Sequence, residues 1–216
     1  MVFGLFGNND NGSKEEETSA SKEASRSGAP GFQTTPGCTA LVTGSSGLCG
    51  ARLVEMLLER GAKTVICFDM AEPDPVLSQR FSNVQTSTGG KLILCHGTKD
   101  GNLTNKASVQ AAFEKAPKID VVYHIAALVG PFHDKDKYAA VNYEGTLTII
   151  DMCKKYKVPR LVYSSSPSTR FTGADVEGAT EDELPIPDTF LAMYAETKAQ
   201  GEKAVAAACC DELLTV

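Results

Sequence analysis

Five short, mostly apolar runs recur along the chain, and helical patterns separate them. The runs lie at 39–43, 64–68, 91–95, 120–125 and 160–164. Apolar residues at nearly every position of a strand are typical of parallel sheets that helices cover on both faces. Because such strands alternate with helices here, we predict an α/β fold, a Rossmann-type doubly wound parallel sheet.

Four helices are predicted between and after these strands, at 51–60, 106–115, 138–156 and about 191–209. The first places Leu53, Val54, Leu57 and Leu58 on one apolar stripe and ends before Gly61. Residues 213–216 have the pattern of the first residues of a further strand.

The first 36 residues differ in composition from the rest of the chain. They are rich in Ser, Glu, Lys, Gly and Asn and carry little that could be buried. Such a segment cannot offset the entropy lost on ordering, so we predict a disordered arm at 1–36 and one domain, the Rossmann domain, at 37–216.

The overall charge excludes some partners. With a net charge of −6, the chain has no electrostatic attraction to nucleic acid or to an anionic membrane. No run approaches the roughly 18 apolar residues of a membrane span. Seven scattered cysteines indicate a reducing compartment, and three isolated histidines without a Cys-x-x-Cys motif predict no metal site.

A glycine-rich turn joins the first strand to the first helix. Gly44, Gly47 and Gly50 permit a tight turn, a close approach to a pyrophosphate and close packing of helix on strand. The N-terminus of the helix that follows offers N–H groups to phosphates. Asp69 ends the second strand, where a carboxylate can accept hydrogen bonds from ribose hydroxyls and repel the extra phosphate of NADP. The turn and Asp69 together predict NAD as the cofactor; a loop-initiating Asp69 is the alternative.

The last predicted helix carries Tyr194 and Lys198 one turn apart on the same face. A phenol, with an ordinary pKa of about 10, is a poor base at neutral pH, but a neighbouring ammonium stabilises the phenolate. This pair therefore predicts an acid–base centre, whereas two exposed neighbours are the alternative for the pair taken alone.

Gly44-x-x-Gly47-x-x-Gly50 together with Tyr194-x-x-x-Lys198 resembles the extended short-chain dehydrogenase/reductase superfamily. The segments VVYHIAA (121–127), VNYEGT (141–146) and LVYSSSPSTRFTG (161–173) look like its fourth-strand, helix and catalytic-serine motifs, in the expected order. The stretch from YSSSPS to TEDELP is closest to the 3β-hydroxysteroid dehydrogenase branch, and within it to the sterol-4α-carboxylate 3-dehydrogenases (decarboxylating).

This resemblance implies roles for residues of this chain. Ser166 orients the substrate oxygen, with Ser165 as the alternative; Tyr194 is the base; Lys198 tunes Tyr194 and holds the nicotinamide ribose. Asn142 either supports Lys198 through a water or satisfies backbone groups. Residues expected to bind the cofactor are Gly44, Gly47, Leu48, Cys49, Gly50, Asp69, Asn102, Leu103, Ala126, Ala127, Asn142, Tyr194 and Lys198. His124 is expected to hydrogen-bond locally and His133 to lie in a solvated loop.

Two features depart from the superfamily. Asn102-Leu103 replaces the usual Asp-Leu or Asp-Ile pair near the adenine, with Asp100 as an alternative. The remaining strands and the smaller substrate domain have no counterpart in the chain, so we expect a C-terminally incomplete sheet and a fragment. An uncovered hydrophobic edge strand would otherwise be an aggregation hazard.

The main prediction is an NAD-dependent oxidoreductase that acts on the 3β-hydroxyl of a steroid or sterol, including a 4-carboxysterol that loses carbon dioxide. The alternatives are an NAD-dependent sugar-nucleotide epimerase or dehydratase, and an NAD-binding fragment without turnover. The expected partner is a small-molecule substrate, with a homodimer as the candidate assembly. The expected location is the cytoplasm or the cytoplasmic face of the endoplasmic reticulum.

Overall fold

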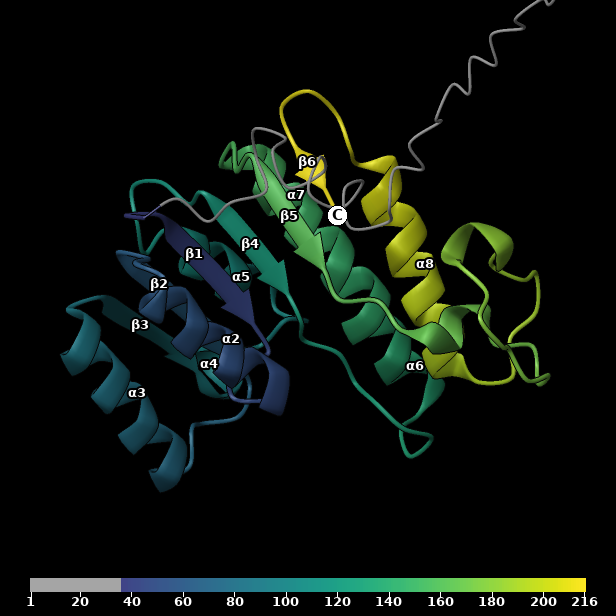
Figure 1. Cartoon of the computed structure of the whole chain (residues 1–216), viewed down its shortest axis with the longest axis horizontal. Helices are drawn as coiled ribbons and strands as arrows, with labels where there is room; N and C mark the ends of the chain where they lie inside the picture. Colours follow the sequence, from purple (N-terminus) through teal and green to yellow (C-terminus); the bar gives the residue numbers. More distant parts are fainter. Residues whose placement is uncertain (1–35) are drawn as a thin grey trace, which may run out of the picture. The chain divides into compact units, whose positions relative to one another are not determined.

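The computed structural model describes residues 36–216. The predicted N-terminal arm therefore lies, except for its last residue, outside the described residues. The described part is built around one sheet of six parallel strands (Figure 1). These strands are β1 (Thr39–Thr43), β2 (Thr64–Asp69), β3 (Lys91–His96), β4 (Val121–His124), β5 (Arg160–Tyr163) and β6 (Leu214–Thr215).

The order of the strands confirms the predicted doubly wound fold. From β1 the chain steps outward to β2 and β3, then returns to place β4, β5 and β6 on the other side of β1. This reversal leaves a crevice at the carboxyl ends of β1 and β4, where ligands of open α/β sheets bind. The expected last strand is present as β6, which pairs in parallel with β5 through Leu161 and Thr215.

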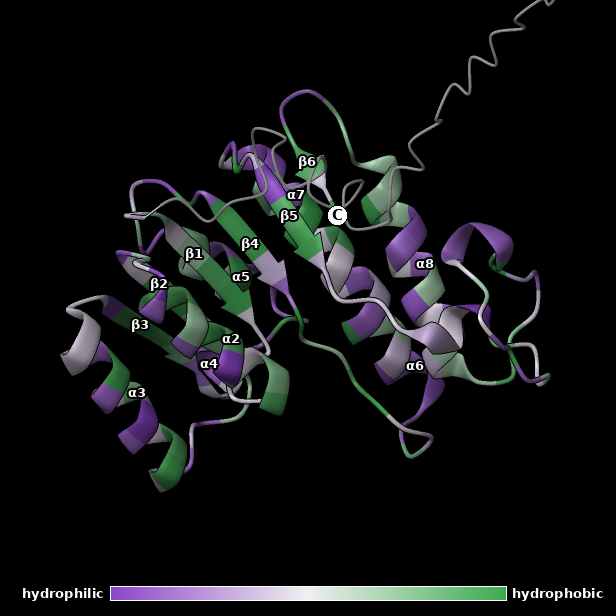
Figure 2. Cartoon of the chain, viewed as in Figure 1, coloured by the Kyte–Doolittle hydropathy of each residue, from purple (hydrophilic) through white to green (hydrophobic). Residues whose placement is uncertain are grey.

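Helices cover both faces of the sheet. They are α2 (Leu48–Glu59), α3 (Pro75–Thr88), α4 (Gly97–Asp100), α5 (Lys106–Phe113), α6 (Lys135–Tyr138), α7 (Gly145–Lys155) and α8 (Met193–Ala207), with a π-helix η1 (Ala139–Glu144) and two 3₁₀ turns, η2 (Pro167–Arg170) and η3 (Glu181–Glu183). The apolar side chains form two clusters, one shared by α2 and α3 and the other by α5, α7 and α8. Figure 2 shows the hydrophobic strands between helices whose outer faces are hydrophilic.

Helix α3 is absent from the sequence prediction. Its only buried side chains are Leu77, Phe81 and Val84, so its apolar stripe is narrow. The sequence does carry signals of this helix at its two ends. Asp74 caps the N-terminus by accepting from the Leu77 N–H at 2.7 Å, and Gly89 ends the helix with a φ of +71°.

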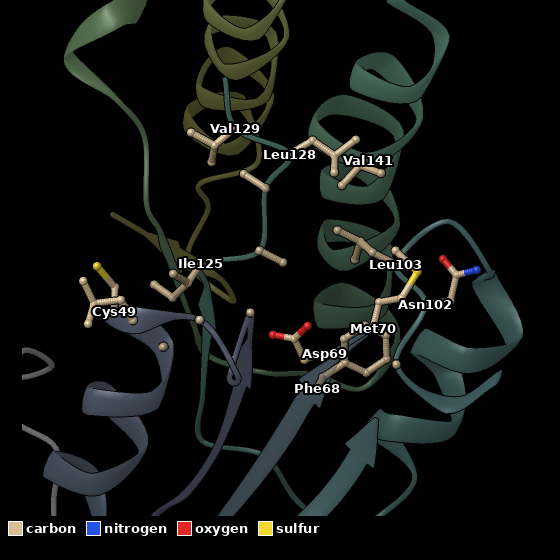
Figure 3. A pocket seen from close by; sticks show the side chains of 17 residues that line it. Cys49, Phe68, Asp69, Met70, Asn102, Leu103, Ile125, Leu128, Val129 and Val141 are labelled. Carbon is tan, nitrogen blue, oxygen red and sulfur yellow. The ribbon is translucent and has the colours of Figure 1, made fainter. Parts of the chain in front are cut away.

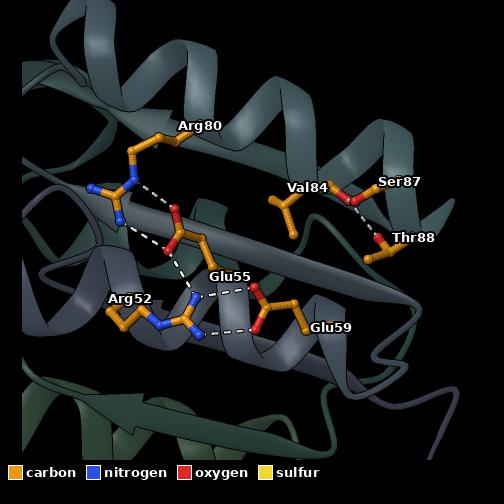
Figure 4. Close-up of polar contacts among 7 residues, drawn as sticks. All are labelled: Arg52, Glu55, Glu59, Arg80, Val84, Ser87 and Thr88. Carbon is orange, nitrogen blue, oxygen red and sulfur yellow. Dashed lines mark hydrogen bonds and ion pairs between the residues drawn. The ribbon is translucent and has the colours of Figure 1, made fainter.

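An ion-pair network joins α3 to α2 (Figure 4). Glu55 of α2, whose side chain is 9% exposed, accepts two hydrogen bonds from Arg80 of α3 at 2.7 and 2.9 Å. Arg52 donates to the same carboxylate at 3.1 Å and also pairs with Glu59. The network adds a polar contact between the two helices to the apolar contact that Leu77, Phe81 and Val84 make.

The predicted helix at 138–156 consists of three consecutive segments, α6, η1 and α7. The π-helix η1 carries one surplus residue in its wide turn, a feature that is frequent at functional sites. It places Asn142 in the interior, where the residue is 1% exposed. No helix within residues 36–216 has the length and apolar character that crossing a membrane would require.

Candidate active site

The glycine turn after β1 is shaped by contacts that leave no room for side chains. Gly44 has a φ of +73°, and a Cβ there would lie 2.8 Å from the Ala126 nitrogen. A Cβ at Gly50 would lie 2.0 Å from the Gly44 carbonyl oxygen, so the N-terminal turn of α2 packs directly on the loop. A Cβ at Gly47 would meet only that oxygen, at 3.4 Å, which leaves the space above the helix N-terminus open. The tight turn at Gly44 and the close packing at Gly50 are as predicted, and the approach of Gly47 to a pyrophosphate stays a prediction.

A cleft of about 370 Å³ opens beside this turn, between the ends of β1, β2 and β4 (Figure 3). Apart from Asn142, Tyr194 and Lys198, every residue predicted to bind the cofactor lines it. These lining residues are Gly44, Gly47, Leu48, Cys49, Gly50, Asp69, Asn102, Leu103, Ala126 and Ala127. The cleft thus collects segments that are far apart in the sequence.

Asp69 projects into the cleft from the end of β2 (Figure 3). Its Oδ2 accepts from the Ser46 N–H and its Oδ1 from the Ala71 N–H, both at 2.9 Å. The carboxylate therefore ties the glycine turn to β2. A carboxylate has about four acceptor positions, so it can still accept hydrogen bonds from the hydroxyls of a ribose.

Asn102 lines the cleft, but its side chain is already engaged. Its Oδ1 accepts from the Thr104 N–H at 3.0 Å and from the Thr104 hydroxyl at 2.8 Å. In Figure 3 its amide points away from Asp69. An adenine amino group would therefore compete with Thr104 for this oxygen. Asp100, the alternative, ends α4 and is not among the lining residues.

Sequence reasoning missed several lining residues, namely Phe68, Met70, Gly101, Ile125, Leu128, Val129 and Val141. Gly101 carried a readable signal, because a glycine just before the adenine-side pair allows close backbone approach. A Cβ at Gly101 would lie 1.8 Å from the Asp69 carbonyl oxygen. The aliphatic residues carried no signal that separates a cleft wall from a core.

Helix α8 carries the predicted acid–base pair. Lys198 is 2% exposed, and its ammonium donates to the Ser164 carbonyl oxygen at 2.6 Å. The same ammonium lies 4.0 Å from the centroid of the Tyr163 ring. Burial lowers the pKa of Lys198 to about 8, while the negative charge of Glu202 acts in the opposite direction. Tyr194 is half-buried one helical turn before Lys198.

The two candidate serines have different environments. Ser165 donates its hydroxyl to the carboxylate of Glu202. Ser166 caps η2 instead, because its Oγ accepts from the Ser168 N–H at 3.3 Å and lies 2.8 Å from the Ser168 Oγ. Lys198 reaches the end of β5 through Ser164, two residues before Ser166, and η2 packs against α8. The structure thus brings the three predicted catalytic residues onto two packed segments.

Asn142 satisfies backbone groups, the second of the two roles considered for it. Its Oδ1 accepts from the Leu128 N–H at 2.8 Å, and its Nδ2 donates to the Leu128 carbonyl at 3.1 Å. Its Nδ2 also lies 3.3 Å from the Thr197 hydroxyl, next to Lys198 in the chain. It therefore joins the loop after β4 to α8. A water-mediated contact with Lys198 stays a prediction.

His124 is bonded locally, as predicted. The Thr43 Oγ1 accepts from the Ile125 and Ala126 N–H groups, so its own proton goes to the His124 Nδ1 at 2.7 Å. The His124 Nε2 must then carry hydrogen and donate to the Thr146 hydroxyl at 3.0 Å. Burial lowers the pKa of His124 to about 3, so the ring is neutral at physiological pH. It holds the backbone that lines the cleft.

Comparisons with known proteins agree with this geometry. The family model described as "3-beta hydroxysteroid dehydrogenase/isomerase family" matches residues 41–214. The sterol-4-alpha-carboxylate 3-dehydrogenase, decarboxylating, of Schizosaccharomyces pombe is 34% identical over 178 residues, which cover 81% of this chain and 47% of the relative. The 2-alkyl-3-oxoalkanoate reductase of Shewanella oneidensis is 30% identical, covering 76% of this chain and 37% of the relative. The chain therefore spans less than half the length of these two proteins.

Solved structures share the fold. The UDP-glucuronic acid 4-epimerase of Bacillus cereus, determined in complex with NAD, is 26% identical with a TM-score of 0.61. The superposition covers 79% of this chain and 52% of the epimerase.

Proposed function

The chain belongs to the 3-beta hydroxysteroid dehydrogenase/isomerase family, and we propose that it provides the NAD site and the catalytic residues of an oxidoreductase for the 3β-hydroxyl of a steroid or sterol. The observation that carries this proposal is the placement of Lys198. Its buried ammonium lies at the end of β5, on the helix that carries Tyr194 and against the segment that carries Ser166.

The residues of the cleft fit NAD. The glycine turn leaves room above the N-terminus of α2 that would suit a pyrophosphate, and Asp69 lines the same cleft with a carboxylate that could accept hydrogen bonds from ribose hydroxyls. The same carboxylate would repel the extra phosphate of NADP. When bound, NAD supplies the acceptor for a hydride.

Each residue of the catalytic set has a defined role in this proposal. Tyr194 accepts the proton of the substrate hydroxyl as the hydride leaves the carbinol carbon. The ammonium of Lys198 stabilises the phenolate and also holds the nicotinamide ribose, and Ser166 donates to the substrate oxygen. Since the pKa of Lys198 is about 8, most of this residue is charged at neutral pH.

The relatives narrow the substrate class. One is named for a sterol that carries a carboxylate at carbon 4, beside the carbon 3 that is oxidised, and the other for a 3-oxo acid with an alkyl group at carbon 2. Both names describe an oxygen-bearing carbon next to a carbon that carries a carboxylate. We infer that the substrate is a β-hydroxy acid of this kind, such as a 4-carboxysterol. Its oxidation gives a β-keto acid, which loses carbon dioxide without a dedicated residue.

The test is to mix the protein with NAD and a 4-carboxy-3β-hydroxysterol and to follow the absorbance of NADH. We expect NADH to accumulate in proportion to substrate, with release of labelled carbon dioxide from the carboxyl group. A sterol whose hydroxyl is already oxidised to the ketone is the control. Binding of NAD without formation of NADH would contradict the proposal and favour an NAD-binding module.

A second candidate is an NAD-dependent sugar-nucleotide epimerase. The likeness to the epimerase of Bacillus cereus favours it, because that protein combines the same fold with bound NAD. An epimerase retains its cofactor through the cycle, so conversion of a UDP-sugar without net NADH would distinguish it from the dehydrogenase.

A further inference from the structure

Glu202 lies one helical turn beyond Lys198 on α8 and collects hydrogen bonds from a distant segment. Its Oε2 accepts from the Ser165 hydroxyl and lies 3.4 Å from the Thr169 hydroxyl, whose proton goes to the Ser166 carbonyl oxygen at 2.8 Å. Arg170 donates through Nη1 to Oε2 at 3.1 Å and through Nη2 to Oε1 at 2.6 Å. All of these donors belong to residues 165–170, which follow β5 and include Ser166.

The interaction is shielded from water, unlike an ordinary surface ion pair. The side chains of Arg170 and Glu202 are 18% and 22% exposed. Burial alone would raise the pKa of the Glu202 carboxyl, but hydrogen bonds from Arg170 and Ser165 bring it below its ordinary value. Glu202 is therefore charged at neutral pH.

The segment is attached to the rest of the domain by the packing of η2 against α8, where Thr169 is buried, and by hydrogen bonds near its start. At its start, the Ser164 N–H donates to the His124 carbonyl at 3.0 Å, and the Ser164 carbonyl accepts from Lys198. Next to it, η2 is a single 3₁₀ turn that Ser166 caps by local bonds alone. Lys198 and Glu202 thus hold the two ends of the segment from one face of α8.

We propose that Glu202 is a positioning residue: its carboxylate fixes residues 164–170 against α8 and so presents the Ser166 hydroxyl to the substrate. The inference rests on the proposed function for what Ser166 does there. The contacts that Glu202 makes do not depend on that function.

The charge of Glu202 has a second effect, on Lys198. Burial favours the neutral amine of Lys198, and the Glu202 carboxylate on the same helix favours the ammonium. The other titratable groups that face this lysine are His124 of β4, which is neutral, and Tyr163 of β5, whose pKa burial raises. Tyr194 lies one turn earlier on α8. The charge of Arg170 is neutralised by its pairing with Glu202.

The test compares Glu202→Gln with Glu196→Gln, the same change on the same helix. Among residues 36–216, the Glu196 carboxylate accepts only from the Gln200 amide, at 3.4 Å. Hydrogen exchange needs no substrate, and we expect Glu202→Gln to speed exchange of the Thr169 and Phe171 amides by about tenfold, the equivalent of one lost hydrogen bond to a charged group. The sheet amides and the control variant should be unchanged.

A nitrogen NMR titration of the lysine ammonium groups provides the second readout. Glu202→Gln should move the titration of Lys198 to lower pH, and in an active preparation the alkaline limb of kcat should move in the same direction. We also expect kcat to fall about tenfold through misplacement of Ser166, with unchanged affinity for NAD. Glu202→Asp keeps the charge and should restore most of the Lys198 titration.

Unchanged exchange at residues 164–171 together with an unchanged Lys198 titration would overturn the inference. If Glu202→Gln does not fold, Glu202→Asp and Arg170→Lys still give the exchange readout, because each weakens the pairing while keeping its charge. The Lys198 titration should then stay close to that of the native protein, since the carboxylate charge is kept. A native protein that forms no NADH would count against the proposed function alone, since neither exchange nor titration requires turnover.

Discussion

The two sides of the proposed active site are held together in different ways. On the β2 side, the glycine turn is shaped by backbone contacts, such as that of Gly50 with the Gly44 carbonyl. On the β5 side, side chains that are far apart in the sequence do the same work, such as Arg170 with Glu202. The glycines of such a turn can be recognised from their spacing in the sequence, whereas the partners of a side-chain pair such as Arg170 and Glu202 are brought together only by the finished fold.

One buried residue connects the two sides. His124 bonds to Thr43 of β1 and to Thr146 of α7, and its ring lies 5.6 Å from that of Tyr163. It therefore links β1 to α7, the helix that precedes β5. Variants on either side test this difference. We expect those on the β5 side to change turnover and those on the β2 side to change folding or NAD affinity.

The largest effect is expected on the β5 side, from Tyr194→Phe. Removing the hydroxyl leaves the cofactor cleft intact but deletes the base, so turnover should fall by roughly a hundredfold or more with little change in NAD affinity. Tyr156→Phe is the matched control, because the Tyr156 hydroxyl bonds only to Glu114 on the surface, at 2.6 Å. Turnover that survives in Tyr194→Phe would remove this residue from the chemistry.

On the β2 side, two glycine variants separate folding from binding. In Gly50→Ala the new methyl would overlap the Gly44 carbonyl oxygen, so we expect a loss of about 1–3 kcal/mol in unfolding free energy together with lost NAD affinity. Gly47→Ala has space for its methyl in the free protein. It should unfold like the native protein and still bind NAD more weakly, as measured by calorimetry. Equal NAD affinity in Gly47→Ala would place the pyrophosphate elsewhere.

A smaller effect is expected at Asp69, where the β2 side selects the cofactor. Asp69→Ala removes the acceptor of the ribose hydroxyls, so NAD affinity should fall about tenfold, as for a lost hydrogen bond to a charged group. Discrimination against NADP should relax at the same time. Asp69→Asn is the companion variant: it removes the charge with little change in size, and its single oxygen can still accept from either the Ser46 or the Ala71 N–H, which bond to different oxygens of Asp69. An unchanged preference for NAD in both variants would remove Asp69 from the site.

The smallest effect on function is expected from Glu55, which lies outside the cleft. Hydrogen bonds from Arg80, and then from Arg52, hold the pKa of Glu55 below its ordinary 4.5 against the effect of burial. The stabilisation by this pairing is therefore fully present above about pH 4.5, the ordinary pKa of the carboxyl. It is lost as the pH falls through the lower pKa that Glu55 has in the folded protein.

Glu55→Gln removes the charge that pairs with the two arginines and should lower the unfolding free energy at neutral pH. The loss should be only roughly 1–2 kcal/mol, because the arginines are half-exposed and solvent weakens the pairing. In urea titrations the difference from the native protein should shrink at acidic pH, while NAD affinity stays constant. A difference that is independent of pH would show that Glu55 acts through packing and not through charge.

Much of the fold could be predicted because its signals are local. The predicted strand bounds agree with the observed strands within two residues, since each apolar run is short and uninterrupted. Helix α3 was missed because Leu77, Phe81 and Val84 are few among polar residues, although Asp74 and Gly89 mark its ends. Its attachment through Arg80 and Glu55 is visible only once the chain is folded.

The site residues also divide into those with a local sequence signal and those brought together only by folding. The glycines of the turn and Asp69 followed from their spacing relative to the first two strands, whereas the other predicted lining residues came from the resemblance. The engagement of Asn102 by Thr104 was also local, and the Asn-x-Thr pattern could have revealed it. Glu202 could not have been found, since an acidic residue on a helix is ordinarily solvated and its partner Arg170 lies 32 positions away.

The π-helix η1 limits how the chain can change in length. Its surplus residue lets Val141 line the cleft while the adjacent Asn142 bonds to the Leu128 backbone. Deleting one residue from 139–144 would restore ordinary helical winding and rotate everything on one side of the cut by about 100°. Either Asn142 would leave Leu128, or the apolar stripe of α7 with Ile149 would turn out of the core. Substitutions are therefore easier to accommodate along this helix than the removal of a single position.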